Sequence, residues 1–93
     1  MVKVNKIEKV LQSAIEKFNK YHSPEVHAEL ANMEKEFTVI KFSGPACSGC
    51  GAYDYFEDLR IEVENKAGNP FDILHIDKDG NNFLVKFDLK WLK

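Results

Sequence analysis

The fold of this chain is decided by the stretch FTVIKFSGPACSGC, which occupies residues 37–50. Its first part, residues 37–42, is rich in β-branched and aromatic side chains and predicts a strand. A loop that contains glycine and proline then leads to Cys47 and Cys50. We therefore expect a strand that delivers the chain through a short loop to a pair of thiols.

A helix is expected directly after the second cysteine. Along residues 52–67, apolar residues recur at steps of four and three, with acidic residues between them. The apolar positions are Ala52, Phe56, Leu59, Val63 and Ala67. Gly68 followed by Pro70 is a typical end for such a helix. Residues 59–64 also alternate as a strand would, but the longer helical stripe and its terminator favour the helix.

Upstream of the central strand, the sequence predicts one long amphipathic helix over about residues 3–21. Its apolar positions are spaced by three and four residues, with lysine and glutamate between them. These positions are Val4, Ile7, Leu11, Ala14, Ile15, Phe18 and Tyr21. Pro24 ends the helix, because proline disfavours a helical conformation in the residue before it.

Two interpretations compete for residues 25–33. A second helix would have Ser23 as its N-cap and Pro24 at its first position. A strand would instead place alternate apolar residues on one face. We favour the strand, because the polar residues 32–35 then form a short turn into the central strand.

The last third of the chain predicts a β-hairpin. Residues 71–77 form its first strand, residues 78–82 the turn, and apolar residues alternate along residues 83–91. This last stripe suits a hydrophobic core. On an edge strand at a chain terminus, the same stripe would instead suit a partner.

The expected order of elements is helix, strand, strand, helix, strand, strand, in a single domain spanning residues 1–93. A chain of this length has no room for a second domain. We therefore predict an α+β fold, in which two helices pack on one face of a small sheet of three or four strands, mixed or antiparallel.

Composition argues against several classes of protein. The formal net charge is −2, so no basic footprint for a phosphate backbone or an anionic membrane is evident. No apolar run approaches the roughly 18 residues of a membrane span, and the N-terminus lacks the apolar segment of a signal peptide. We expect a soluble cytoplasmic protein without nucleic-acid or membrane partners.

Cys47 and Cys50 are the two cysteines of the chain and its only concentration of reactive groups. They are too few for a disulfide framework, but their spacing is that of redox and metal-binding thiols. A helix N-terminus next to them favours the thiolate form that either chemistry requires.

Two thiolates are half of the four ligands that structural zinc or a four-iron cluster normally takes. A second chain is one source of the missing ligands. Histidines, here His22, His27 and His75, are another, for zinc. A dithiol that works by redox exchange needs none, and both cysteines are also compatible with small buried residues of no chemical role.

The run from residue 7 to residue 76 resembles the C-terminal, NifU-like domain of iron–sulfur cluster scaffold proteins. That family has a leading amphipathic helix, a β-hairpin, a Cys-x-x-Cys motif that opens a second helix, and a closing strand. The matching stretches are FSGPACSGC at residues 42–50, KIEKVL at residues 6–11 and PEVHAEL at residues 24–30.

The resemblance implies a role for Cys47 and Cys50 as the ligands of a labile iron–sulfur cluster. It also implies a homodimer that shares a four-iron cluster, and apo iron–sulfur proteins as clients. A scaffold of this kind holds and hands over its cargo and has no catalytic residues of its own. Because such a cluster is labile, the resemblance is compatible both with an isolated protein that carries the cluster and with one that holds none.

Two alternatives stay open. The succession of strand, Cys-x-x-Cys, helix and strand also resembles a thioredoxin-like oxidoreductase, with Cys47 as the attacking thiolate and Cys50 as the resolving one. The other alternative is a structural or assembly module in which both cysteines are incidental.

Overall fold

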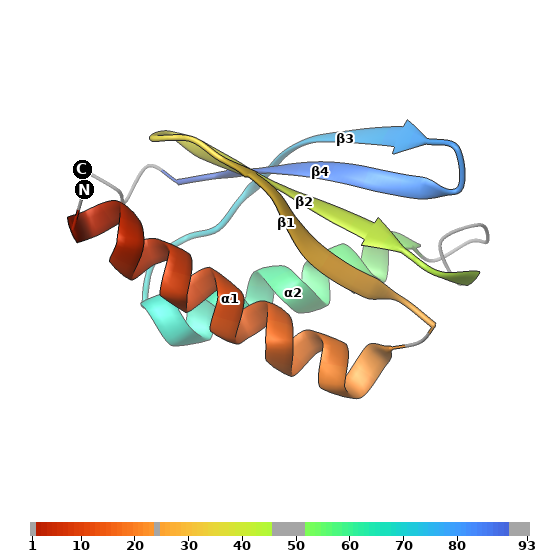
Figure 1. Ribbon diagram of the computed structural model, residues 1–93, viewed down its shortest axis with the longest axis horizontal. Coiled ribbons are helices and arrows are strands. Elements are labelled where there is room, and N and C mark those ends of the chain that lie inside the picture. The colour runs from red at the N-terminus through yellow and green to blue at the C-terminus, as the bar shows by residue number, and fades with distance from the viewer. Residues whose placement is uncertain (1, 24, 46–51, 90–93) are drawn as a thin grey trace.

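The computed structural model describes residues 2–23, 25–45 and 52–89 (Figure 1). The predicted order of helix, strand, strand, helix, strand, strand is confirmed. The elements are α1 (Val2–His22), β1 (His27–Met33), β2 (Phe37–Ser43), α2 (Ala52–Ala67), β3 (Ile73–Asp79) and β4 (Asn82–Asp88).

The strands form a four-stranded sheet in the order β1-β2-β4-β3, and every neighbouring pair is antiparallel. Both helices lie on the same side of this sheet (Figure 1). Because β4 is inserted between β2 and β3, those two strands run in the same direction on either side of it. The unit β2-α2-β3 is therefore a crossover connection that has been split by a strand. The predicted α+β architecture is confirmed as its antiparallel version.

β4 is an interior strand, so the alternative that residues 83–91 form an edge strand is wrong. It pairs with β2 from Phe42 opposite Phe83 to Phe37 opposite Asp88, and with β3 on its other side. Val85 on this strand is fully buried. The expected stripe is thus core, although its last member, Trp91, lies outside the described residues. The edge strands are β1 and β3.

The predicted strand at residues 25–33 is confirmed as β1, which pairs with β2. A side chain of α1 holds its other edge. Asn19 donates from Nδ2 to the carbonyl oxygen of Ala28 at 2.9 Å, and the amide of Ala28 donates to Asn19 Oδ1 at 2.7 Å. The amide group of Asn19 therefore acts on β1 as a neighbouring strand would. A bulge between Leu30 and Asn32 makes this edge irregular further along.

The hydrophobic core fills the space between the helices and the inner face of the sheet. Tyr21, which the helical spacing places on the apolar stripe of α1, is 69% exposed. The inward position in the last turn belongs instead to His22, four residues after Phe18. The buried apolar residues are Leu11, Ala14, Ile15, Phe18, Val26, Ala28, Ile40, Phe42, Phe56, Leu59, Val63, Phe71, Val85, Phe87 and Leu89.

Two glycines end elements where the sequence predicted. The amide of Gly68 donates to the carbonyl oxygen of Glu64 at 2.8 Å, and its φ of 72° is the left-handed conformation of a helix C-cap. Gly80, with φ of 63°, opens the turn between β3 and β4. The predicted turn at residues 78–82 is shorter than expected, because Lys78 and Asp79 still pair with β4.

Candidate functional site

The two predicted ligands, Cys47 and Cys50, lie outside the described residues. On one side of them, β2 ends at Ser43 and is followed by Gly44 and Pro45. On the other side, α2 begins at Ala52. The described residues therefore define where the cysteine segment, residues 46–51, starts and where it rejoins the fold.

Aromatic side chains from both helices and both central strands pack together at the end of the sheet where β2 stops. The ring of Phe42 lies 5.8 Å from that of Phe18 and 4.7 Å from that of Phe56. The ring of Phe56 in turn lies 5.3 Å from that of Phe83, which pairs with Phe42 across the strands. We call this group the ring cluster, and its members are Phe18, His22, Phe42, Tyr55, Phe56 and Phe83.

Within the ring cluster, His22 also lies close to a carboxylate. Its ring lies 4.3 Å from that of Phe18 and stands edge-on to that of Tyr55 at 5.4 Å. Its Nε2 lies 3.7 Å from Oδ2 of Asp58, so a protonated imidazole forms an ion pair with that carboxylate. The sequence gives no signal for this contact, because it joins two helices that are far apart along the chain.

A row of polar side chains follows one face of α2. The hydroxyl of Tyr53 donates to Glu57. Arg60 donates from Nε to Glu57 at 2.7 Å and from Nη1 to Glu64 at 2.9 Å. Glu64 also accepts a hydrogen bond from the amide of Phe71 at 2.9 Å, which fixes the connection between α2 and β3. This row was not expected from the sequence, although its helical spacing of three and four residues is the signal that could have revealed it.

These hydrogen bonds shift the pKa values of the groups that make them. Glu57 raises the pKa of Tyr53 above its ordinary value of 10.0, first through the hydrogen bond and then through its negative charge. The hydrogen bonds from Arg60 and then from Tyr53 lower the pKa of Glu57 below its ordinary value of 4.5. The folded state therefore favours a neutral phenol beside a charged carboxylate.

Glu57→Gln is expected to return the pKa of Tyr53 toward its ordinary value, because the carboxylate that stabilises the neutral phenol is removed. The same logic gives the pH dependence of the pair. Its contribution to folding is present above the ordinary pKa of Glu57 and is lost as the pH falls through the lowered one. At the alkaline end it is present below pH 10.0 and is lost as the pH rises through the raised pKa of Tyr53.

An NMR titration of a Tyr53 ring carbon measures the pKa of Tyr53 directly, in the wild type and in the Glu57→Gln variant. Glu62→Gln is the matched control, because Glu62 lies on the same helix and pairs with Lys17 at 3.5 Å. An unchanged Tyr53 pKa in the Glu57 variant would contradict the bond, whereas the control should leave it where it is in the wild type.

The three histidines considered as zinc ligands are not brought together. His27 lies 3.1 Å from the hydroxyl of Ser23, and His75 lies 2.9 Å from Asp77 on its own strand. His22 contacts Asp58 instead. Within the ranges 2–23, 25–45 and 52–89, no group of three or more histidine, cysteine, aspartate or glutamate side chains is placed to hold a metal ion.

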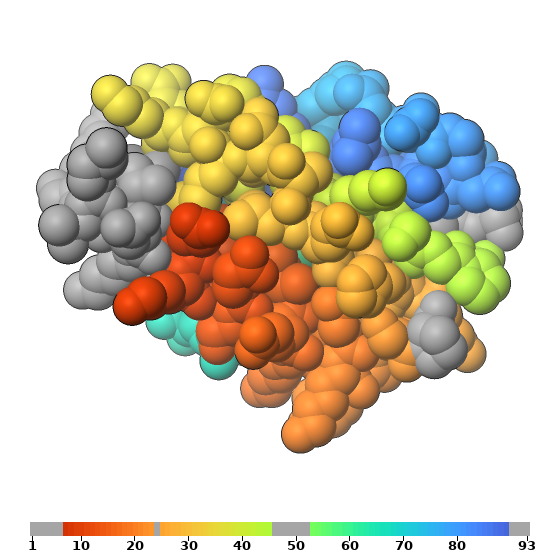
Figure 2. Space-filling view, viewed as in Figure 1, coloured from red at the N-terminus to blue at the C-terminus, as the bar shows by residue number. Residues whose placement is uncertain are grey.

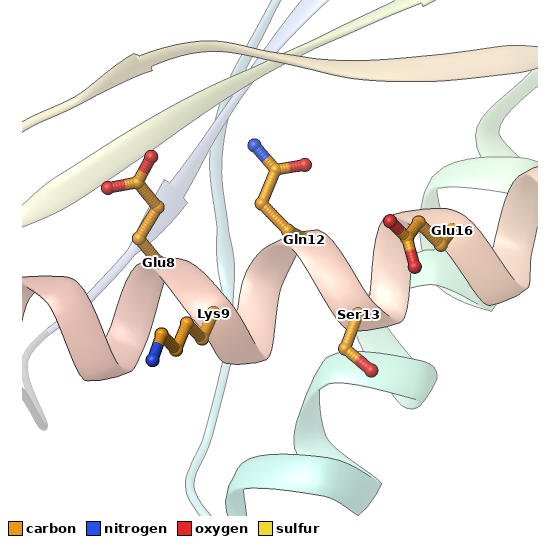
Figure 3. Close-up of a pocket in the computed structure, with 5 residues that line it drawn as sticks. All are labelled: Glu8, Lys9, Gln12, Ser13 and Glu16. Atoms are coloured by element: carbon orange, nitrogen blue, oxygen red, sulfur yellow. The ribbon is translucent and has the colours of Figure 1, made fainter.

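A shallow hollow follows the solvent face of α1, where its lining residues in the described part of the chain are Glu8, Lys9, Gln12, Ser13 and Glu16. All five side chains are exposed and come from one helix. Glu8 and Gln12 project to one side of the helix and Lys9 to the other (Figure 3). The groups do not converge on a common point, so the hollow does not form a second chemical site.

Comparisons with family models, with curated proteins and with solved structures each return no match. Neither helix described in Figure 1 has an apolar stretch long enough to cross a membrane.

Proposed function

We propose that this chain binds an iron–sulfur cluster through the thiolates of Cys47 and Cys50 and hands it to other proteins. The observation that carries the proposal is the position of the Cys-x-x-Cys motif in the segment between the end of β2 and the start of α2. The first helical residue, Ala52, follows Cys50 by two positions. The amino end of a helix stabilises negative charge, so thiolates near it are favoured over thiols.

The ring cluster supports the same proposal. Its members Phe42 and Phe56 are fully or almost fully buried, and they lie on the two elements that the cysteine segment connects. Phe42 precedes Cys47 by five residues and Phe56 follows Cys50 by six, so the cysteine segment is anchored in the apolar core at both of its ends. Exposure to solvent and local polarity are among the factors that set the stability and the reduction potential of such clusters.

The ligand count supports a cluster shared between two copies of the chain. A four-iron cluster takes four cysteine thiolates, and the chain contains two cysteines. A symmetric pair of chains supplies the full set without any other residue. Each cluster is then held at the surface between subunits, where a client protein can displace one pair of thiolates at a time.

Anaerobic reconstitution with ferrous iron and sulfide tests the proposal. We expect a brown protein with sulfur-to-iron charge-transfer absorbance and about four irons and four sulfides per two chains. Cys47→Ser and Cys50→Ser should each abolish the colour and the iron, because too few thiolates then remain. Ser48→Ala, which changes a residue between the two cysteines, is the matched control and should retain both.

A colourless wild-type protein under these conditions would overturn the proposal. The same samples then distinguish the alternatives. A dithiol that equilibrates with a glutathione buffer would indicate a thioredoxin-like oxidoreductase. Zinc in the purified protein that is lost in the serine variants would indicate a zinc site. Serine variants with unchanged folding, mass and redox behaviour would indicate a structural module.

A further inference from the structure

Among the described residues, no strand lies on the outer edge of β3. β3 lies at the margin of the sheet, and in the described part of the chain it pairs with β4 only. The opposite margin is different, because Asn19 already bonds the backbone of Ala28 on β1. In the space-filling view, the blue hairpin of β3 and β4 forms the upper right border of the molecule (Figure 2). An exposed strand edge is a ready template for further pairing.

The side chains of β3 divide clearly between the two faces of the sheet. Ile76 lies opposite the buried Val85 and so faces the helices. His75 and Asp77 face the open side, where their side chains are 62% and 66% exposed and 2.9 Å apart. Leu74, at the irregularity in the pairing, is 51% exposed.

These residues make β3 complementary to itself in one register. When two copies of a strand pair antiparallel about a two-fold axis, directly opposed residues must lie on the same face of the sheet. The axis therefore lies midway between one residue and the same residue of the second copy, and we name the axis by that residue. An axis at Asp77 opposes that carboxylate to its own copy. An axis at His75 opposes the imidazole to its own copy. Only an axis at Ile76 opposes His75 to Asp77, and it does so twice.

We propose that β3 is a self-association edge, at which a second copy of this chain adds its own β3 antiparallel about a two-fold axis at Ile76. On the open face, His75 of each copy then lies opposite Asp77 of the other. On the helix face, the two Ile76 side chains meet at the axis.

The contact goes beyond the proposed function and is independent of it. It uses neither cysteine, and antiparallel pairing directs the carboxyl ends of β2 in the two copies away from each other. A cluster shared between two chains is therefore a second, separate contact. Because one pair of edge strands buries a small interface, the association is weak and depends on concentration.

Sedimentation equilibrium over a wide concentration range tests the proposal in the Cys47→Ser/Cys50→Ser protein, so that cluster binding does not affect the outcome. This protein is expected to form a reversible dimer. His75→Asp should weaken the dimer at least about tenfold, because it opposes like charges at two places related by symmetry. The double variant His75→Asp/Asp77→His should restore the dimer, because it exchanges the two residues and recreates both opposed pairs.

Two controls test whether the dimer forms through β3 in the proposed register. His27→Asp introduces the same change at an exposed position of β1, and it should leave the dimer unchanged. In the cysteine-free protein, Ile76→Cys should couple to its own copy through a short bifunctional thiol reagent, whereas Ile61→Cys, on the exposed side of α2, should not. Circular dichroism verifies that each variant is folded.

A cysteine-free protein that is monomeric at every concentration would overturn the proposal. So would equal weakening by His75→Asp and His27→Asp, or a double variant that stays monomeric. Loss of iron binding in the cysteine variants with an intact dimer would leave the edge proposal standing. A dimer combined with a wild type that takes up no cluster would overturn the proposed function alone.

Discussion

Phe42→Ala is expected to lower the free energy of unfolding by about 3–5 kcal/mol, which is the usual cost of deleting a buried phenylalanine ring. Phe42 is fully buried at the centre of the ring cluster. Its ring contacts Phe18 from α1 and Phe56 from α2, so its loss leaves a cavity at which both helices and the sheet meet. Domains of this size are stable by only about 5–15 kcal/mol, and the variant should lose a large part of that margin.

Phe37→Ala is the matched control for this prediction. Phe37 lies on the same strand but is only half-buried, on the open face, with Lys86 Nζ 4.1 Å from the centre of its ring. Its removal should cost about 1–2 kcal/mol, because it gives up a cation–π contact and partial burial without opening a cavity. Urea unfolding followed by circular dichroism measures both values. Equal losses in the two variants would contradict the assignment of Phe42 to the centre of the core.

Asn19→Ala is expected to lower the free energy of unfolding by about 2 kcal/mol, because it removes two hydrogen bonds and leaves two backbone groups of β1 without their partner. The bonds to the amide and the carbonyl of Ala28 measure 2.7 and 2.9 Å and are partly buried. They are the contact that replaces a neighbouring strand at this edge. The effect should therefore be local as well as global.

Hydrogen exchange separates the two effects. In the Asn19 variant, the Ala28 amide should lose more protection than the amides of β4, which is enclosed by two strands. Gln12→Ala, on the exposed side of the same helix, is the control and should change the stability by less than about 0.5 kcal/mol. Unchanged protection at Ala28 in the Asn19 variant would show that its side chain does not hold the strand.

Under the two proposals, cluster binding and self-association use different parts of the fold. The end at which β2 stops presents the ring cluster and leads into the cysteine segment. The margin formed by β3 presents alternating charge that suits a second copy. Both follow from the antiparallel arrangement of the sheet, which places β3 at the margin and keeps the apolar residues of β4 inside.

Periodicity in the sequence was sufficient to predict the elements. The predicted helix at residues 52–67 agrees with the structure, and the predicted strand at residues 25–33 forms over residues 27–33. Each has a local cause, which is apolar spacing with a glycine terminator in the helix and alternation before a polar turn in the strand. Tyr21 was misassigned because a stripe of three- and four-residue steps does not decide which residue of the last turn faces inward. His22 takes that position and packs against Phe18.

The sequence by itself determined the class of fold, the order of the elements, the core positions of the central strand and the identity of the two thiols. The tertiary structure decided which hairpin strand lies in the interior of the sheet, which strands form its edges, and which side chains from separate helices meet, as His22 and Asp58 do. The physical reason is one of range. Local spacing fixes which face of a strand or helix is apolar, whereas strand order and contacts between helices depend on how those faces are buried together.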